Sequence, residues 1–288
     1  MSFDLLAGKA RGRAASRAAS EPRPESGSGT SPEAIVAQSA RRESTSALGY
    51  SVARFEQMRG AAIRRLDKKT VHQLRVSIRR LQAALRLMGL HEERRSLRPL
   101  MQLAGEVRNR DVAMELAEPA PMRQELWQQR RHHAAALKEA VRAFALAPLV
   151  EQPLAPPAGL VKAFFRAGRR AAGKPTAGRL HALRLAGKRL RYAIEFLLPV
   201  LDASVIIRLR DLKHLQQELG QANDCATART LTSDAEFHAV LARKEQGHRG
   251  RFAEYWRENF EVLGAWESWR LFWRGVVRQA AAVRRAVR

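Results

Sequence analysis

The stretch VHQLRVSIRRLQAALRLM, Val71 to Met88, decides the fold, because it is a basic helical segment that occurs twice in the chain. Its second copy is LHALRLAGKRLRYAIEFL, Leu180 to Leu197. Another pair of segments follows in the same order, LRPLMQLAGEVRN at Leu97 to Asn109 and LKHLQQELGQAND at Leu212 to Asp224. Two motifs that recur in the same order indicate a duplicated unit and not a chance likeness between basic helices.

The remainder of the chain is also helical in pattern. From about Ser44 onward the apolar residues recur with a helical period, Gly and Pro punctuate the segments, and we find no convincing alternating strand pattern. We therefore predict an all-α helical domain over residues 44–288, built as two pseudo-symmetric antiparallel bundles. The first half covers residues 44–150 and the second 156–288, with EQPLAPPAG (Glu151 to Gly159) as a hinge between them. Residues 1–43, rich in Ala, Arg, Ser, Gly and Pro, are predicted to form a disordered basic tail.

The net charge of the chain is unusually high. The 288 residues include 52 Lys and Arg against 28 acidic residues, which gives a net charge of +24. Such an excess opposes folding by self-repulsion, so a compact chain that carries it usually meets a polyanion. Nucleic acid, polyphosphate and an anionic membrane all qualify. Arg dominates the basic residues, and its planar guanidinium binds phosphate oxygens bidentately, which favours a phosphate ligand.

The cations of the first copy form one row along the predicted helix. At about 100° per residue they fall within a sector of about 60°, and the row is about 27 Å long. The row comprises Lys68, His72, Arg75, Arg79 and Arg86. The adjacent stripe, which should face the core, comprises Val71, Leu74, Ile78, Leu81 and Leu85. No acidic residue lies between Lys68 and Met88 to relieve the repulsion, so we expect the compensating charge to come from outside the chain.

The second copy repeats this arrangement. Its row comprises His181, Arg184, Lys188 and Arg191, with Glu195 where the first copy has Arg86. Either row alone could be an ordinary solvated surface. Two rows at matched positions, packed about a pseudo-twofold axis, would instead face each other across one groove or channel. A linear chain of phosphates would suit that groove.

These segments together resemble the conserved histidine α-helical domain (CHAD) family over roughly residues 44–285. The pattern His-x-x-Arg-x-x-x-(Arg/Lys)-(Arg/Lys) occurs in both copies, each followed by the Leu-Gly segment. The resemblance implies two helical bundles with a basic groove or pore that binds inorganic polyphosphate, and an association with polyphosphate granules. The binding residues that it implies are His72, Arg75, Arg79, Arg80 and Arg98 in the first half, and His181, Arg184, Lys188, Arg189, Arg191, Tyr192 and Lys213 in the second. Asn109 departs from the family, which usually has Asp there, so we expect a changed helix-end contact.

The sequence favours binding over catalysis. It has no Glu-x-Glu-x-Lys triphosphatase motif, no Gly-rich phosphate loop and no clustered carboxylates on the basic helices to hold Mg²⁺. We therefore expect no enzymatic activity, no cofactor and no metal site; the adjacent His132 and His133 would diverge on a helix. The alternative function is general binding of nucleic acid or another polyanion, which the same charge would support. No helix-turn-helix, zinc-finger or RNA-recognition pattern favours it.

Three further features bear on location and packing. No apolar run is long enough to span a membrane and the first residues lack a signal-peptide core, so we expect a cytoplasmic protein. Cys225 is the only cysteine, and we expect a small buried residue. Trp266, Trp269 and Trp273 share one helix face near Trp256. They predict core packing of the second bundle, with an apolar docking patch as the alternative.

Overall fold

The computed structural model describes residues 32–117, 120–150, 152–198, 201 and 205–286, and within them all regular secondary structure is helical. The first half contains α1 (Pro32–Arg64), α2 (Lys68–Leu87), α3 (His91–Ser96), α4 (Arg98–Leu116) and α5 (Ala120–Ala143). The second half contains α6 (Leu160–Gly173), α7 (Ala177–Leu197), α8 (Val205–Arg229), α9 (Ala235–Phe260) and α10 (Ala265–Ala286). The prediction of an all-α fold is confirmed.

The predicted disordered tail is too long at its C-terminal end. Residues 1–31 lie outside the described residues, but residues 32–43 belong to α1. Pro32 occupies the first position of α1, where its missing N–H costs nothing, and the following alanine-rich sequence favours a helix. The absence of a clear apolar period in this stretch concealed its helical propensity.

The duplicated helices α2 and α7 begin with the same kind of cap. The Asp67 carboxylate accepts a hydrogen bond from the backbone N–H of Thr70 at 2.8 Å, and the Thr176 hydroxyl accepts one from Arg179 N–H at 3.4 Å. After α2 the chain turns at Gly89, whose φ of 72° lies in the left-handed region. The predicted core stripe of α2 is buried at every position, and so is the corresponding stripe Leu180, Leu183, Leu190 and Ile194 of α7.

Each half has its own hydrophobic core. One cluster joins α1, α2, α4 and α5, and another joins α6 to α10. The second cluster contains Trp256, Trp269 and Trp273, which are buried, with Trp266 packed partly buried against it. The tryptophans therefore form core, as the helix spacing predicts. A smaller cluster, which includes Ala113, Leu126, Cys225 and Leu241, joins the two halves where α4 and α5 meet α8 and α9.

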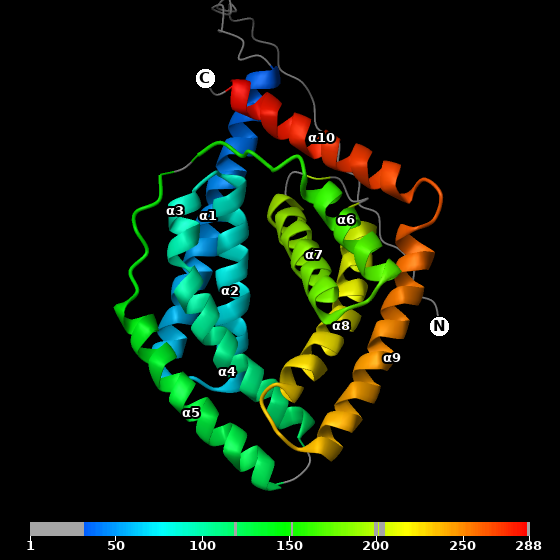
Figure 1. The fold of residues 1–288 in the computed structure, drawn as a ribbon. Helices are drawn as coiled ribbons and strands as arrows, with labels where there is room; N and C mark the ends of the chain where they lie inside the picture. Colours follow the sequence, from blue (N-terminus) through cyan, green and yellow to red (C-terminus); the bar gives the residue numbers. More distant parts are fainter. Residues whose placement is uncertain (1–31, 118–119, 151, 199–200, 202–204, 287–288) are drawn as a thin grey trace, which may run out of the picture.

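The segment between the halves is fixed to both of them. It runs from the end of α5 to the start of α6 and includes the predicted hinge. The N–H of Ala155 donates to the carbonyl of Leu87 at 2.6 Å, and the Trp273 indole N–H donates to the carbonyl of Pro157 at 2.9 Å. These bonds tie Ala155 to the end of α2 and Pro157 to α10, and α10 additionally crosses back to contact α1 (Figure 1). Within the described ranges, no helix has both the length and the apolar character needed to cross a bilayer.

Candidate functional site

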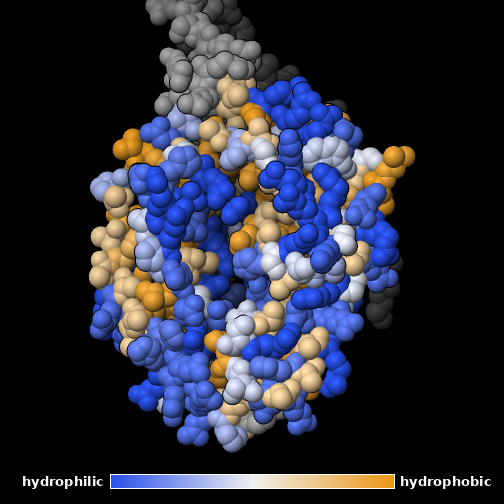
Figure 2. All heavy atoms as spheres, viewed as in Figure 1, coloured by the Kyte–Doolittle hydropathy of each residue, from blue (hydrophilic) through white to orange (hydrophobic). Residues whose placement is uncertain are grey.

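A cavity of about 500 Å³ lies between the two halves, where α2, α3 and α4 face α7. Figure 2 shows a hollow near the centre of this face of the molecule, edged by hydrophilic side chains. The cavity is lined by Arg79, Gln82, Ala83, Arg86, Arg94, Arg98, Met101, Gln102, Leu185, Lys188, Arg189, Tyr192 and Ala193. Both predicted cationic rows therefore contribute to one cavity, the first row through Arg79 and Arg86 of α2 and the second through Lys188 of α7.

Four cations lie close together beside this cavity, Arg75, Arg79, Arg184 and Lys188, and of these Arg79 and Lys188 line it. Lys188 lies within electrostatic reach of all three arginines, and Arg184 lies close to Arg79. Arg75 Nη1 and Arg184 Nε are buried and have no hydrogen-bond partner in the described part of the chain. Buried charged donors are normally paired, because an unpaired one loses its hydration without compensation. The cluster thus presents donors that an anion in the groove would satisfy.

The pKa values express the same imbalance of charge. Burial, followed by repulsion from Arg79 and Arg184, lowers the pKa of Lys188 to about 5. Burial and the neighbouring Arg79 lower the pKa of Arg75 to about 9. At the other end of the cavity, burial and the charge of Arg94 lower the pKa of Arg86 to about 10. In each case the environment disfavours the charged form of the side chain. An anionic ligand in the groove would favour the charged form and raise these pKa values.

One carboxylate acts on two cations of the cluster. Asp224 of α8 acts electrostatically on both Arg75 and Arg184. Its counterpart in the first copy is Asn109, so that half lacks a facing carboxylate at this position. The expected changed helix-end contact at Asn109 is wrong, because α4 continues through Asn109 to Leu116. The substitution changes the charge beside the groove and leaves the helix intact.

The two histidines that begin the rows have different neighbours. In the first half, burial, then the charge of Arg108, then that of Arg75, lowers the pKa of His72. In the second half, Asn223 stands where the first has Arg108, and its Oδ1 lies 3.1 Å from Nδ1 of His181. His181 lines a separate cavity of about 320 Å³ against α8. Duplication preserved the histidines, but only His72 lies among the groove cations.

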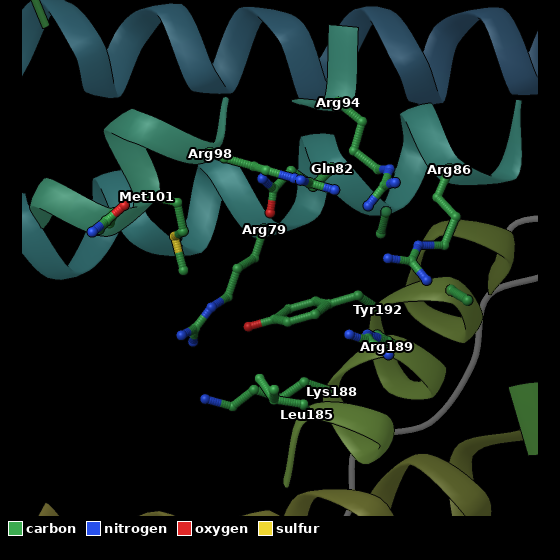
Figure 3. A pocket seen from close by; sticks show the side chains of 13 residues that line it. Arg79, Gln82, Arg86, Arg94, Arg98, Met101, Leu185, Lys188, Arg189 and Tyr192 are labelled. Atoms are coloured by element: carbon green, nitrogen blue, oxygen red, sulfur yellow. The ribbon is translucent and has the colours of Figure 1, made fainter. Parts of the chain in front are cut away.

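Tyr192 forms an aromatic wall of the groove. Its side chain is 6% exposed and projects from α7, and Figure 3 shows Arg79, Arg94 and Arg98 extending toward it from the opposite wall. Arg191 lies over the Tyr192 ring at 4.7 Å and pairs with Glu195 at 3.4 Å. Arg191 therefore supports the wall and adds charge behind Lys188, but it does not line the cavity.

Several predicted site residues lie away from the cavity. Arg80 and Lys213 are exposed and are not among its lining residues. The lining also does not include the predicted residues His72, Arg75, His181, Arg184 and Arg191. Lys68, at the start of α2, is ion-paired with Glu115 of α4. The sequence predicts Lys68 as an uncompensated member of the row, and this long-range partner overturns that expectation. Binding by all the predicted residues stays a prediction.

The structure also adds residues that the repeat did not indicate. Arg94, on the short helix α3, lines the cavity beside Arg86 and Arg98, and its Nε is buried without a partner among the described residues. Helix α3 lies outside the duplicated segments, so repetition could not reveal it. Arg108 lies within a duplicated segment, but its counterpart Asn223 is uncharged, which concealed its place beside His72. Gln82 and Gln102 complete the polar lining.

Comparison with known proteins identifies the family. Residues 47–233 match the CHAD domain family; the match ends before α9, short of the expected residue 285. The structure resembles the crystal structure of the CHAD domain from the plant Ricinus communis, with a TM-score of 0.51 and 23% identity over 79% of this chain and 90% of that one. At this identity the likeness shows the fold alone. No curated protein matches the chain. Polyphosphate binding is a known role of the matched family. This chain belongs to the CHAD family.

Proposed function

We propose that the protein binds inorganic polyphosphate, without catalysis, in the groove between α2 and α7. The observation that carries the proposal is the convergence of Arg75, Arg79, Arg184 and Lys188, whose buried donors include two without partners in the described chain. Phosphate oxygens would satisfy these donors by charge-assisted hydrogen bonds, the strongest class between side chains and anions. Binding would also release the counterions of the polyanion, which makes the affinity depend on salt.

A linear ligand suits the distribution of these cations. They extend along α2 from His72 to Arg86 and continue onto α3 and α4 with Arg94 and Arg98. A row of this length, about 20 Å at about 1.5 Å per residue, exceeds what one phosphate could contact. Successive phosphate units of one chain would meet successive guanidinium groups.

The composition of the groove favours binding over phosphoryl transfer. Enzymes that transfer phosphoryl groups usually hold Mg²⁺ with carboxylates, which neutralise developing charge on the phosphate. Asp224 acts electrostatically on two arginines of the cluster, and Glu195 pairs with Arg191. Both already compensate protein cations. We therefore propose a binding protein that associates with polyphosphate granules in the cytoplasm.

Nucleic acid is the alternative ligand, since Lys and Arg bind its phosphates without reading sequence. Proteins that bind single strands usually add exposed aromatic side chains on which bases stack. The aromatic residue of the groove, Tyr192, is buried and already carries Arg191 on its ring. Polyphosphate has no bases and a denser charge, which fits a wall composed of guanidinium groups.

Competition binding tests the choice of ligand. Labelled long-chain polyphosphate would be bound to the purified full-length protein near physiological salt, then challenged with single-stranded RNA, duplex DNA and short phosphates. The proposal predicts that unlabelled polyphosphate displaces the label at concentrations orders of magnitude lower, per charge, than either nucleic acid. Equal competition per charge would make the protein a general polyanion binder.

A further inference from the structure

A second cationic surface lies outside the groove, on the outer side of α6. The apolar side of α6 packs Val161, Phe164 and Phe165 into the core of the second half. The opposite side carries four exposed cations, which are Lys162, Arg166, Arg169 and Arg170. None of the four takes part in an ion pair within the described ranges, and no Asp or Glu occurs anywhere from Gln152 to Ile194.

An apolar turn projects beside these cations, between α9 and α10. Val262 is 49% exposed and Leu263 is 105% exposed, the highest value among the exposed large apolar side chains described. Gly264 follows with a φ of 80°, a left-handed conformation that closes the turn tightly. In Figure 2 an orange protrusion marks the upper right edge of the molecule, where Figure 1 places this turn, next to the blue surface over α6.

Trp266 connects the turn to the cationic side of α6. Its ring packs edge-to-face on Phe165 at 5.2 Å between centroids, and the Arg169 guanidinium lies over it at 5.9 Å. The two carboxylates that flank the turn already have partners. Glu261 accepts a hydrogen bond from the Trp256 indole at 2.9 Å, and Glu267 pairs with Arg270 at 2.5 Å. An anionic surface that approaches the turn would meet the four α6 cations and the apolar side chains of the turn, with the charge of Glu267 compensated by Arg270 and that of Glu261 outnumbered by these cations.

We propose that this docking face, formed by the four α6 cations together with Val262 and Leu263, binds an anionic lipid bilayer. The cations would contact lipid phosphates, and the turn would insert its apolar side chains below the headgroups. Basic residues near a membrane attract anionic lipids, and apolar side chains that enter the interface convert this weak attraction into stable attachment. Trp266 would lie at headgroup depth, a position that suits an indole ring. A nucleic acid would satisfy the cations but would leave the apolar turn in water.

Vesicle flotation tests the apolar part of the docking face. The full-length protein should float with vesicles of phosphatidylcholine and phosphatidylglycerol, and not with phosphatidylcholine alone, near physiological salt. Because any chain of charge +24 is attracted to anionic vesicles, the decisive comparison uses a charge-neutral change. Val262→Ser with Leu263→Ser should weaken binding at least about tenfold, since two inserted apolar side chains are lost. The matched control is Tyr50→Ser with Val150→Ser, which removes side chains that are 66% and 70% exposed elsewhere and should leave binding unchanged.

Two further measurements separate insertion from net charge. Changing the four α6 cations to Gln should abolish flotation, whereas the same loss of charge from exposed residues elsewhere should not; that control set is Arg123, Arg142, Arg243 and Lys244. An environment-sensitive dye at Leu263→Cys, in a chain also carrying Cys225→Ala, should shift to the blue on vesicles. Equal losses for both charge variants, or a serine turn variant that floats like its control, would overturn the proposal. Loss of self-association in the turn variant, with flotation intact, would assign the face to a second copy of the chain instead.

Discussion

Lys188 is the side chain whose protonation should change most when a polyanion enters the groove. Burial and the neighbouring arginines lower its pKa to about 5, so the charged form of the amine is disfavoured in the free protein. Its cationic neighbours are Arg75 and Arg79 from α2 and Arg184 and Arg191 from α7, with Asp224 of α8 as a carboxylate that faces two of them. Phosphate oxygens would favour the ammonium and raise this pKa, so the complex would hold more protons than the free protein.

Because the complex would hold more protons than the free protein, binding of polyphosphate should take up protons from solution. The affinity for polyphosphate should fall as the pH rises from about 6 to 8, because deprotonation then opposes the bound state. His72, whose pKa is also lowered in the free protein, acts in the same direction. Calorimetry in buffers of different ionisation enthalpy measures the uptake. Lys188→Arg should reduce the proton uptake, since a guanidinium stays charged in the free protein. The control is Lys213→Arg on the exposed side of α8, which should leave the proton uptake unchanged. Binding without net proton uptake in the unmodified protein would contradict this account.

Gly105 lies against the guanidinium of Arg75. A Cβ on Gly105 would lie 2.9 Å from Arg75 Nη1, so this guanidinium would have to move aside. Its counterpart in the second copy, Gly220, has nothing within 4 Å of the equivalent position. The two glycines therefore offer a matched pair, because Ala favours a helix over Gly at both sites by up to about 1 kcal/mol.

Gly105→Ala should leave the fold intact and weaken polyphosphate binding about tenfold, because a displaced Arg75 loses one charge-assisted hydrogen bond. Gly220→Ala should bind like the unmodified protein and be slightly more stable. Equilibrium binding and denaturant unfolding of the two variants check both statements. Equal affinities would mean that the observed position of Arg75 does not matter to the ligand.

The pairing of α4 with α5 depends on an ion pair that the sequence pattern did not reveal. Asp111, whose side chain is 2% exposed, accepts from Arg130 Nε at 2.5 Å, and Arg130 also donates to the carbonyl of Leu66 at 2.8 Å. Asp111→Ala would leave the Arg130 charge largely buried without its carboxylate and should cost about 3–5 kcal/mol of unfolding free energy. Glu92→Ala, which removes the 79% exposed partner of Arg95, should cost less than about 1 kcal/mol. Denaturant unfolding of both variants, with midpoints and slopes, measures the two losses of unfolding free energy. Similar losses would contradict a structural role for the Asp111–Arg130 ion pair.

Helical period and duplication account for what could be predicted about α2 and α7. A stripe such as Val71 and Leu74 must face the core at 3.6 residues per turn, so the place of the neighbouring cations follows. The helical period of the sequence does not predict which residues distant in sequence contact each other. Glu115 neutralises Lys68, and Arg94 reaches the cavity from a helix that the repeat lacks. These contacts depend on how α3 and α4 pack, which a single sequence does not specify.

The net charge of the whole molecule attracts every polyanion, so affinity alone cannot locate the binding site. A chain of charge +24 gains from counterion release wherever its ligand lies. The groove differs from the remaining surface in that its cations are crowded and partly buried, and in that buried donor atoms of Arg75 and Arg184 have no hydrogen-bond partner among the described residues. Variants of equal charge therefore separate the groove from the general field of the protein.

The most direct measurement is the equilibrium affinity of long-chain polyphosphate for two quadruple variants near physiological salt. One changes Arg75, Arg79, Arg184 and Lys188 to Ala; the other changes the exposed Arg123, Arg142, Arg243 and Lys244 to Ala. Both lose the same four formal charges, and circular dichroism confirms their helical fold. We predict that the groove variant loses at least about a hundredfold in affinity, since each lost bond to phosphate contributes about 1.5–3 kcal/mol. The surface variant should retain its affinity within about threefold. Equal affinities for the two folded variants would contradict the assignment of polyphosphate to this groove.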